Sequence, residues 1–459
     1  MKNINQTTFR VFNQTTFCAF VFVSTLLLLA VSAFSTQARI ESMGKRPAFF
    51  IDDATMFDNP ANATFYSNAL MGELGFYNQN SLGANHVGLS QDPFVPWFGG
   101  LFKIGLSDKK EMRDPQITIG GFFGREHQNF TRFVPRKVIV NGSDTVPIPQ
   151  SVTNFDAFLG GTMLDGSAVG AHVYVGVQDG KQDVDDINSN PRIGEMTKDA
   201  HVSILSMDYG VNFLVTNQTS IELTLGAARI QYGPSRKTFL DPGLFSFYSQ
   251  GRLFTDIDAL SGQLVTGYKV ADMEVPGWEE NLYNINAGLN VVIPRGFFWI
   301  GIDAVHVKEE VGTWDKVAGE GEDEYLIYRE PGNLEQYAKD RSDRIGGILS
   351  FGIERNVWNW LVMRFGGQKS FIYNTCHNFS GRTTVCNISD EQSIGQKVNY
   401  WTTNPYGDGS LDDHIGIGVG LNIDDKLKID FSLAEDIFFR NPFRGEGRFI
   451  SRISSIYNF

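Results

Sequence analysis

Beyond residue 40, the chain contains no long hydrophobic run. None of its later apolar stretches reaches the ~18 residues that a membrane-spanning helix needs. Proline is also sparse, at 16 of 459 residues, whereas glycine (48) and phenylalanine (37) are abundant. Helical membrane proteins do not have this composition. A transmembrane β-barrel does, because only every second residue of each strand faces lipid.

Cysteine is nearly absent. Of three cysteines, Cys18 lies in a segment that export would remove, which leaves Cys376 and Cys386. Nine residues separate this pair. Exported proteins occupy compartments that permit disulfides, so we expect a disulfide that closes a loop. A metal site would need more ligands than the adjacent His377 supplies.

An excess of basic charge is absent as well. The formal net charge is −13, from 39 basic and 52 acidic residues. It becomes −15 (37 against 52) once an N-terminal signal that carries Lys2, Arg10 and no acidic residue is removed. An acidic chain of this kind is a poor candidate for binding nucleic acid.

Recognisable catalytic motifs are missing too. The chain shows no Ser-His-Asp order, no His-Glu pair typical of a metalloprotease helix and no glycine loop that would hold phosphate. Its seven histidines are scattered, with His172 and His306 in predicted strands. The acidic run 183–190 lacks the glycine that a calcium-binding loop needs at its turn. The sequence therefore predicts no enzyme, no cofactor and no metal site.

The N-terminus has the features of an export signal. After a positively charged start, Phe17–Val31 forms an apolar core, and small residues offer cleavage sites after Ala33 and after Ala38. The alternative is a membrane anchor, but the apolar core is short for a membrane span. We predict a signal peptide over residues 1–38.

Apolar and polar residues alternate with a period of two along much of the remaining chain. In 201–215, for instance, Leu205, Met207 and Tyr209 alternate with smaller or polar residues. In 414–423, large apolar residues alternate almost entirely with glycine. One apolar face and one polar or small face suits a wall between lipid and a wet lumen. A soluble β-sandwich would alternate as well, so alternation by itself does not decide between the two.

The lengths of the connections favour the barrel. Fourteen strands are expected, near 65–78, 97–106, 116–126, 153–164, 168–178, 201–215, 219–230, 281–293, 297–309, 344–354, 359–373, 414–423, 426–438 and 448–459. Short turns and long loops alternate between them, and every short turn falls on the side where Phe459 ends. An outer-membrane barrel sorts its connections in this way, whereas a sandwich has no reason to do so.

We therefore predict an all-β, transmembrane, up-and-down antiparallel barrel over 65–459, with about 14 strands. The stretch 231–280 leaves the count open, because Leu264–Val275 could hide two further strands and raise it to 16. Aromatic residues cluster at predicted strand ends, where amphipathic rings favour the level of the lipid headgroups. They are Phe297, Phe298, Trp299, Trp358 and Trp360 beside short turns, and Phe371, Tyr373, Phe438 and Phe439 at the other end.

The last residues, 449–459, resemble the closing strand of bacterial outer-membrane proteins. That pattern ends in phenylalanine, with apolar or aromatic residues at alternate positions before it. Phe459, Tyr457, Ile453 and Phe449 fit the pattern, and two serines depart from it. The resemblance implies that Tyr457 and Phe459 form a membrane-insertion signal for the barrel-assembly machinery. It implies a location in the lipid of the bacterial outer membrane.

A second resemblance lies in residues 50–62, which contain Asp-Asp-Ala and, after a short interval, Asn-Pro-Ala. This segment is similar to the opening of the long-chain fatty-acid channel family (FadL type) and of related barrels of a Bacteroidetes-type secretion system (PorV-like). In the fatty-acid channels, it folds into a fourteen-stranded barrel as a plug. The resemblance implies a plug-like segment over 39–64, with the motif residues Asp52, Asp53, Ala54, Asn59, Pro60 and Ala61.

The residues of 39–64 are compatible with a plug. The segment lacks long period-two alternation, yet its phenylalanines, among them Phe49 and Phe57, need burial. Carboxylate and amide side chains here can cap turns or bind arginines that face the lumen. The alternative is a tail that lies under the barrel.

Polar residues on the inward face of the predicted strands are candidates for lining the lumen. They are Asp208, Asn212, Glu222, Asp303, Lys428, Asp430 and Arg452. Both signs of charge occur, so the set does not form a selectivity filter of one sign. The wall of any solvated barrel would carry such residues as well.

Three functions remain open. The first, which rests on the resemblance to the fatty-acid channels, is passive uptake of small, hydrophobic molecules without catalysis. The second is a barrel that holds or transfers a protein partner, and the long outer loops suit that role equally. The third is a general porin with an open polar pore and no plug.

Overall fold

The computed structural model describes residues 37–459 apart from 51, 67, 76–95, 106–115, 126, 128–136, 141–143, 148–152, 164, 180–200, 234–244, 258–260, 276–277, 312–313, 319–323, 329–339, 378–396, 403–412, 424–425 and 434–449. The predicted signal peptide falls outside these residues, except for its last two positions. No helix in the described part is long and apolar enough to cross a membrane.

The helical elements come first and the strands follow. The helices are α2 (Gln37–Ser42), η1 (Pro47–Phe49), η2 (Asp53–Phe57) and η3 (Pro60–Tyr66), the last three being 3-10 helices. The strands are β1 (Ala69–Gly75), β2 (Trp97–Gly105), β3 (Gln116–Phe123), β4 (Lys137–Val140), β5 (Asp144–Pro147), β6 (Thr153–Thr162), β7 (Ala168–Asp179), β8 (His201–Thr216), β9 (Thr219–Gly233), β10 (Ser246–Ile257), β11 (Gly262–Val275), β12 (Trp278–Ile293), β13 (Gly296–Val311), β14 (Trp314–Ala318), β15 (Glu324–Tyr328), β16 (Asp340–Trp358), β17 (Leu361–His377), β18 (Lys397–Thr402), β19 (His414–Ile423), β20 (Leu427–Leu433) and β21 (Ile450–Asn458).

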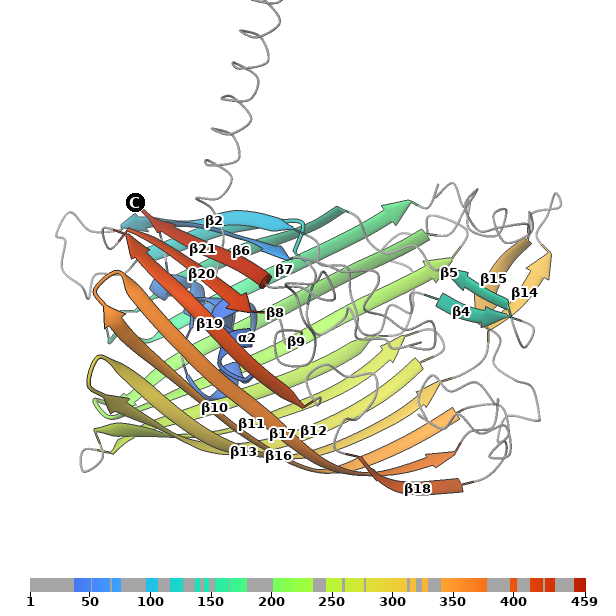
Figure 1. The fold of residues 1–459 in the computed structure, drawn as a ribbon. Coiled ribbons are helices and arrows are strands. Elements are labelled where there is room, and N and C mark those ends of the chain that lie inside the picture. Colours follow the sequence, from blue (N-terminus) through green and yellow to red (C-terminus); the bar gives the residue numbers. More distant parts are fainter. Residues whose placement is uncertain are drawn as a thin grey trace, which may run out of the picture.

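Sixteen of these strands close into one antiparallel barrel (Figure 1). Each strand pairs with its neighbours in chain order, and β21 pairs back onto β1, where Ala69 lies opposite Asn458. β18 pairs with the C-terminal part of β17, and β19 pairs with its N-terminal part. β18 and β19 therefore occupy one position in the ring. The hairpins β4–β5 and β14–β15 form separate small sheets. Closure satisfies the backbone of every barrel strand without leaving an edge.

The predicted fold class is confirmed, and the strand count is sixteen. The two strands absent from the fourteen are β10 and β11, both in the stretch that left the count open. β10 does not alternate cleanly, because aromatic residues lie on both of its faces. Tyr248 and Phe254 are buried in the lumen, whereas Phe247 is exposed on the outside. The sequence of this strand therefore lacks the alternation of apolar and polar residues that marks the other strands.

The short turns lie at the same end of the barrel as Phe459, as predicted. Backbone hydrogen bonds join several of the described turns to the neighbouring strand around this rim. The carbonyl of Gln218, for example, accepts from Asp256 at 2.8 Å, and the carbonyl of Asn68 accepts from Phe459 itself at 3.1 Å. Because outer-membrane barrels carry their short turns on the periplasmic side, we call this the periplasmic rim and the opposite end the outer end.

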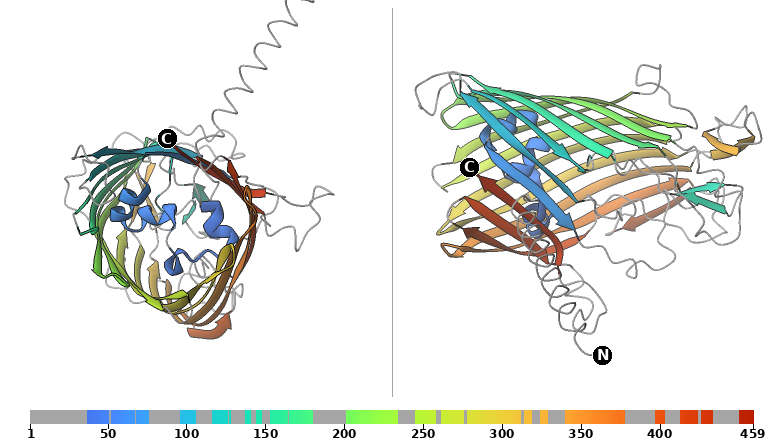
Figure 2. Two further views of the ribbon diagram at one scale, coloured as in Figure 1. Left: turned by 90° about the vertical axis from the view of Figure 1, so that its left-hand side faces the viewer. Right: turned by 90° about the horizontal axis from the view of Figure 1, so that it is seen from above.

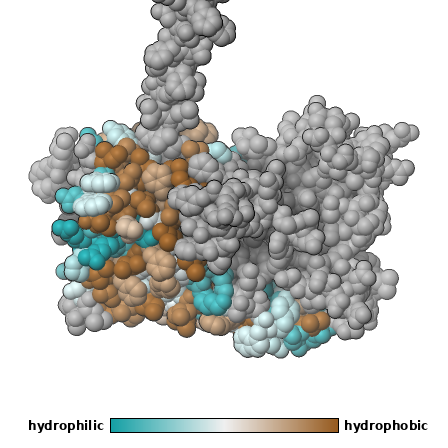
Figure 3. Space-filling view, viewed as in Figure 1, coloured by the Kyte–Doolittle hydropathy of each residue, from teal (hydrophilic) through white to brown (hydrophobic). Residues whose placement is uncertain are grey.

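The outside of the wall is apolar. Outward positions carry large hydrophobic side chains, such as Ile285, Tyr209 and Leu225, which are 69%, 63% and 63% exposed. Figure 3 shows hydrophobic side chains, in brown, gathered over the strands of the face in view. A soluble monomer rarely exposes a continuous apolar surface of this extent. The barrel is therefore built to stand in lipid.

The aromatic ends of the strands divide between lipid and lumen. Trp358 and Trp360 are exposed at the periplasmic rim and stack on each other, with ring centroids 5.4 Å apart. Phe371 is exposed on the outer face, as a girdle residue should be. Trp299 is not a girdle residue, because the alternation of β13 points it into the lumen, where it is fully buried. Phe438 and Phe439 lie outside the described residues.

Residues 37–66, which we call the lumen segment, lie inside the barrel. Figure 2 shows their helices within the ring of strands. α2 contacts β17 and β19–β21, η1 contacts β11–β13, and η3 contacts β2, β3 and β6–β8. The segment therefore crosses the lumen and contacts the wall on three sides.

Candidate functional site

Three rows of glycines on the inner wall receive the lumen segment. In the first row, Gly160, Gly170 and Gly210 lie side by side on β6, β7 and β8. A Cβ on Gly170 would lie 2.4 Å from the backbone carbonyl of Pro60, and one on Gly210 would lie 2.0 Å from Oδ1 of Asn59. Any side chain at these positions would occupy the space of η3. The missing side chains therefore form a seat for it.

The other two rows receive the remaining parts of the segment. Gly352, Gly366 and Gly416 lie side by side on β16, β17 and β19. A Cβ on Gly366 would lie 2.4 Å from the carbonyl carbon of Met43, just after α2. The third row, Gly288 and Gly301 on β12 and β13, holds the ring of Phe49 at distances of 2.4 and 2.3 Å from such a Cβ.

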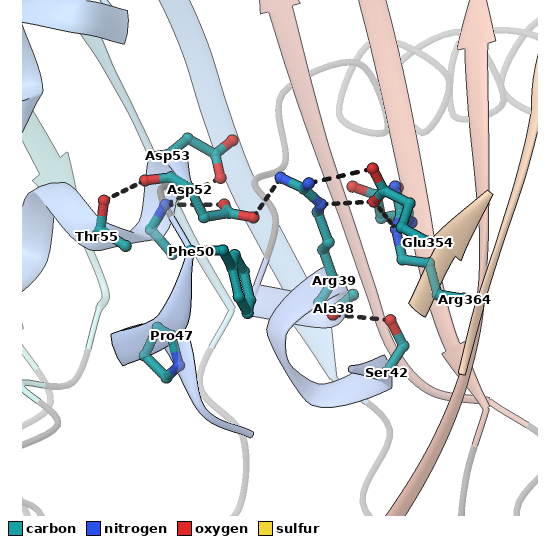
Figure 4. Close-up of polar contacts among 12 residues, drawn as sticks. Ala38, Arg39, Ser42, Pro47, Phe50, Asp52, Asp53, Thr55, Glu354 and Arg364 are labelled. Carbon is teal, nitrogen blue, oxygen red and sulfur yellow. Dashed lines mark hydrogen bonds and ion pairs between the residues drawn. The ribbon is translucent and has the colours of Figure 1, made fainter. Parts of the chain in front are cut away.

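Arg39, in α2, joins the lumen segment to the wall (Figure 4). Its guanidinium lies between Asp52 of the segment and Glu354 of β16, at 2.7 Å from an oxygen of each. Glu354 also accepts from Arg364 of β17 at 2.5 Å, and Arg364 reaches Asp430 of β20 at 2.5 Å. The charges alternate along this chain of contacts, so each buried carboxylate has a cation beside it. Loss of one partner in such a buried pair costs ~3–5 kcal/mol.

A second ionic contact lies where the barrel closes. Arg452 of β21 binds Glu41 of α2 at 2.9 Å and Glu73 of β1 at 2.7 Å. On the opposite wall, Arg252 of β10 pairs with Glu222 at 2.5 Å and donates to the carbonyls of the segment around η1. Both arginines therefore connect strands to each other and to the lumen segment.

The aspartate and asparagine of the predicted motif cap the short helices. Asp52 accepts from the backbone N–H of Ala54 at 3.2 Å at the start of η2, and Asn59 accepts from that of Ala61 at 3.1 Å at the start of η3. Asn59 also donates to the carbonyl of Val211 on β8 at 3.1 Å. Pro60 completes the motif by packing on the first glycine row. The motif residues therefore shape the segment and place it on the wall at the same time.

Asp53 lies in a less favourable environment than Asp52. It is buried, and its Oδ1 accepts from the backbone N–H of Ala54 at 2.9 Å. Burial, and then the charge of the adjacent Asp52, hold the pKa of the Asp53 carboxyl well above its usual range. Asp53 therefore favours its neutral form, whereas Asp52 lies beside the cation of Arg39.

Most of the predicted lumen residues face inward and hold the segment or its partners. Asn212 donates to Asn62 at 3.3 Å, and Asp303 lies 3.8 Å from Arg46. Glu222, Asp430 and Arg452 take part in the ionic contacts described above. Lys428 stands on the inward face near the periplasmic rim and is exposed. Asp208 is buried in a separate cluster on β7 and β8.

Aromatic rings of the segment pack against rings on the inner wall. Phe57 lies among Trp97, Phe122 and Phe158, with ring centroids 5.3–5.7 Å away and mostly edge-on. On the far wall, Phe49 stacks on Trp299 at 5.2 Å. Fully buried aromatic side chains contribute much of the packing energy in such clusters.

The inner wall toward the outer end carries a belt of buried apolar side chains. Tyr248, Ala271, Leu282 and Val307 face one another across β10, β11, β12 and β13. Ile204 and Ile230 pair with each other on β8 and β9, also inward and buried. We call these six residues the apolar belt. A wall that only enclosed water would be polar at these positions.

Sequence reasoning missed the glycine rows and Arg39. Glycine on the polar face was visible in 414–423, but only the strand register shows that glycines of three strands coincide. Arg39 was the first residue of the predicted segment and carried no motif. Of the predicted disulfide, Cys376 is buried at the outer end of β17, and Cys386 lies outside the described residues. Tyr457 and Phe459 lie where β21 meets β1 and closes the barrel, and the ring of Phe459 packs 5.7 Å from that of Phe102.

The fold and the site define a class of protein. A closed sixteen-strand barrel with a lipid-facing apolar surface, short turns at one rim and a segment across its lumen is a transmembrane β-barrel of the kind found in bacterial outer membranes.

Comparison with known proteins gives similarity at the level of the barrel. No protein-family model matches the chain, and no curated protein matches its sequence. The Pseudomonas putida toluene transporter TodX is 12% identical, with a TM-score of 0.35 over 93% of this chain and 99% of that one. A deltaS2 mutant of the TodX monoaromatic hydrocarbon channel is 11% identical, with a TM-score of 0.37 over 92% and 99%. BamA from Haemophilus ducreyi, lacking POTRA domains 1–3, is 9% identical, with a TM-score of 0.32 over 84% and 69%. The fold assignment rests on the strand pairings, not on these scores.

Proposed function

We propose that this barrel is a passive channel for small hydrophobic molecules, with the lumen segment as its plug. The apolar belt is the observation that carries the proposal. Its side chains face inward, toward the outer end from the segment, and a solute that reached them would meet groups of low polarity. Sites that bind small hydrophobic molecules are lined mainly by such side chains, with a few polar groups for orientation.

The way the segment is held supports its role as a plug. It touches the wall through polar contacts, such as that of Arg39 with Glu354, and through glycine seats that form no covalent link. Such contacts can separate and re-form without disturbing the hydrogen bonds between strands. Movement of the segment would then open the periplasmic half of the lumen while the barrel stays intact. No step of this transport needs a catalyst.

Uptake by cells is the direct test. Cells that lack their own hydrophobic channel would produce the protein, and entry of radiolabelled naphthalene and of radiolabelled oleate would be measured. We expect entry to rise above that of cells without the protein. Leu282→Asn in the apolar belt should lower it several-fold. Lys428→Asn, also inward but outside the belt, is the matched control and should leave it unchanged.

The plug is tested by breaking its ionic contact. Arg39→Ala should raise the conductance of the protein in planar bilayers, because buried Asp52 then loses its cation. Arg341→Ala removes a solvent-exposed pair with Glu310 at the outer end and is the control. Exposed pairs of this kind contribute ~0–1 kcal/mol, so it should leave the conductance unchanged.

Two results would replace the proposal. No increase in hydrophobic uptake, together with a defined protein recovered after cross-linking of outer membranes, would favour the partner-holding barrel. Rapid swelling of sugar-loaded liposomes by the wild-type protein would favour a general porin, since an open polar pore admits sugars.

A further inference from the structure

Three side chains of metal-ligand type meet inside the lumen, beside the segment. His127 follows β3, His172 belongs to β7, and Asp208 belongs to β8. One ligand atom of each lies within 4.8 Å of those of the other two, and all three side chains are buried. His172 and Asp208 face each other across the strand pair, one inward position beyond the Gly170–Gly210 pair of the first glycine row.

The distances suit a small cation. Nε2 of His127 lies 3.6 Å from Oδ2 of Asp208, and Nδ1 of His172 lies 2.7 Å from the same oxygen. A zinc ion with nitrogen and oxygen ligands at ~2.1 Å holds those atoms roughly 3–3.5 Å apart. The contact between His172 and Asp208 would need to widen, by less than about 1 Å.

The surrounding groups orient His172. The second ring nitrogen of His172, Nε2, lies 2.7 Å from Oδ1 of Asp156. Asp156 is held in turn by Arg125 through two hydrogen bonds, at 2.5 and 3.0 Å. When Nε2 carries the proton and donates it to Asp156, Nδ1 presents its lone pair toward Asp208. A histidine that ligates a metal through one nitrogen commonly donates the other to a carboxylate in this manner.

Asp208 is positioned as well. Asp208 accepts from the hydroxyl of Tyr248 through Oδ1, which leaves Oδ2 on the side of the two histidines. With both imidazoles neutral, the cluster contains Asp156, Asp208 and one cation, Arg125. Its formal charge is then −1, which favours a bound cation. The alternative is a doubly protonated His172 that donates to both carboxylates.

We propose that His127, His172 and Asp208 form a binding site for a divalent transition-metal ion. Two imidazoles and one carboxylate suit zinc, cobalt or iron(II) better than calcium or magnesium, which prefer oxygen ligands throughout. The ion would join the end of β3 to β7 and β8. It would also stiffen the position of Arg125, whose guanidinium lies over the ring of Phe57 in the lumen segment at 4.0 Å.

Metal titration of the folded full-length protein tests the site. The protein is purified without a polyhistidine tag, treated with a chelator and dialysed, and Zn²⁺ binding is followed by calorimetry. We expect one ion per chain. Co²⁺ should bind in competition with Zn²⁺ and give a visible absorption spectrum typical of nitrogen and oxygen ligands at low coordination number. His127→Ala should weaken Zn²⁺ binding at least tenfold.

The choice of variants separates binding from folding. His127→Ala is preferred because replacing His172 would also break contacts with two carboxylates. His306→Ala is the matched control, since this histidine also pairs with an aspartate, Asp343, at 2.9 Å, but far along the barrel on β13. Folding of each variant is checked by the heat-dependent shift in gel mobility that folded barrels show.

Two outcomes would overturn the proposal. One is a folded wild-type protein that takes up no Zn²⁺ and shows no Co²⁺ spectrum, as a doubly protonated His172 would predict. The other is binding that His127→Ala leaves unchanged in a folded variant. Neither outcome depends on what the barrel transports, so the metal site and the channel can fail separately.

Discussion

The backbone carbonyl of Pro60 lies against Gly170 at the point where a side chain would begin, 2.4 Å from an ideal Cβ. Pro60 belongs to the motif that the sequence singled out, whereas Gly170 lies more than a hundred residues later on β7. The seat of the lumen segment is thus formed by glycines, which have no side chain, on strands that lie outside the motif.

Gly170→Val should loosen the segment without unfolding the barrel. Overpacking of this kind costs ~1–3 kcal/mol, so hydrogen exchange in residues 53–66 should increase by about tenfold or more. The control is Gly161→Val on the adjacent strand β6, where the nearest atom to an ideal Cβ is 3.6 Å away. Equal exchange in both variants would contradict the role of the glycine seat.

Asp52 and Asp53 should respond to amidation in opposite ways, and Asp53 should make docking of the segment depend on pH. The pKa of Asp53 is raised in the docked segment by burial and by Asp52, so its charged form opposes docking. In the undocked segment it ionises at its ordinary pKa. Docking is therefore firmest below that ordinary pKa and weakens as the pH rises through the raised one.

Asp53→Asn should remove this pH dependence and hold the segment at least as firmly at pH 7. Asp52→Asn should loosen it, because Arg39 then loses a carboxylate at 2.7 Å. Hydrogen exchange of residues 37–66, corrected for the intrinsic effect of pH, measures both. If the two variants shift exchange in the same direction, the assigned difference between the carboxyls is wrong.

Phe459→Ala should reduce assembly in cells more than it reduces stability. Its ring is exposed and touches Phe102, while its backbone N–H keeps the bond to Asn68 in the variant. Refolding into detergent should change by less than about 1 kcal/mol, as exposed substitutions usually do. The amount of heat-modifiable barrel in membranes should fall several-fold. Phe102→Ala removes the same ring contact, and equal loss of assembly in that variant would exclude a role as an insertion signal.

Cys376 and Cys386 should form the predicted disulfide. Peptide mapping by mass spectrometry without reduction should recover the two cysteines in one linked pair. Reduction should lower stability by about 2–3 kcal/mol, the usual contribution for a short closed loop. Recovery of both residues in alkylated form from oxidised membranes would show that the prediction is wrong.

The barrel was predictable because its signals are local. Alternation in 201–215 reflects a wall with lipid on one side, and it can be read without knowing which strand lies next. The sorting of short and long connections required only counting from Phe459. β10 was missed for the same reason, because a strand with Tyr248 inside and Phe247 outside carries no local contrast.

The site depended on pairings between distant strands. Trp299 was placed among the lipid-facing aromatics because its neighbours in sequence suggest a girdle, and it is a lumen residue because of its register on β13. His172 was visible only as a scattered histidine until β7 and β8 placed it between Asp156 and Asp208. Such contacts depend on the positions of several strands at once.

By itself, the sequence determined the class of fold, the side on which the turns lie and the segment that differs from the strands. Each of these can be read from residues that are close together in the sequence, because successive residues of a strand face lipid and lumen in turn. The tertiary structure alone decided the sixteen-strand closure, the glycine rows beneath the lumen segment and the partners of Arg39. Those depend on register, because a shift of one residue turns every side chain of a strand to its other face.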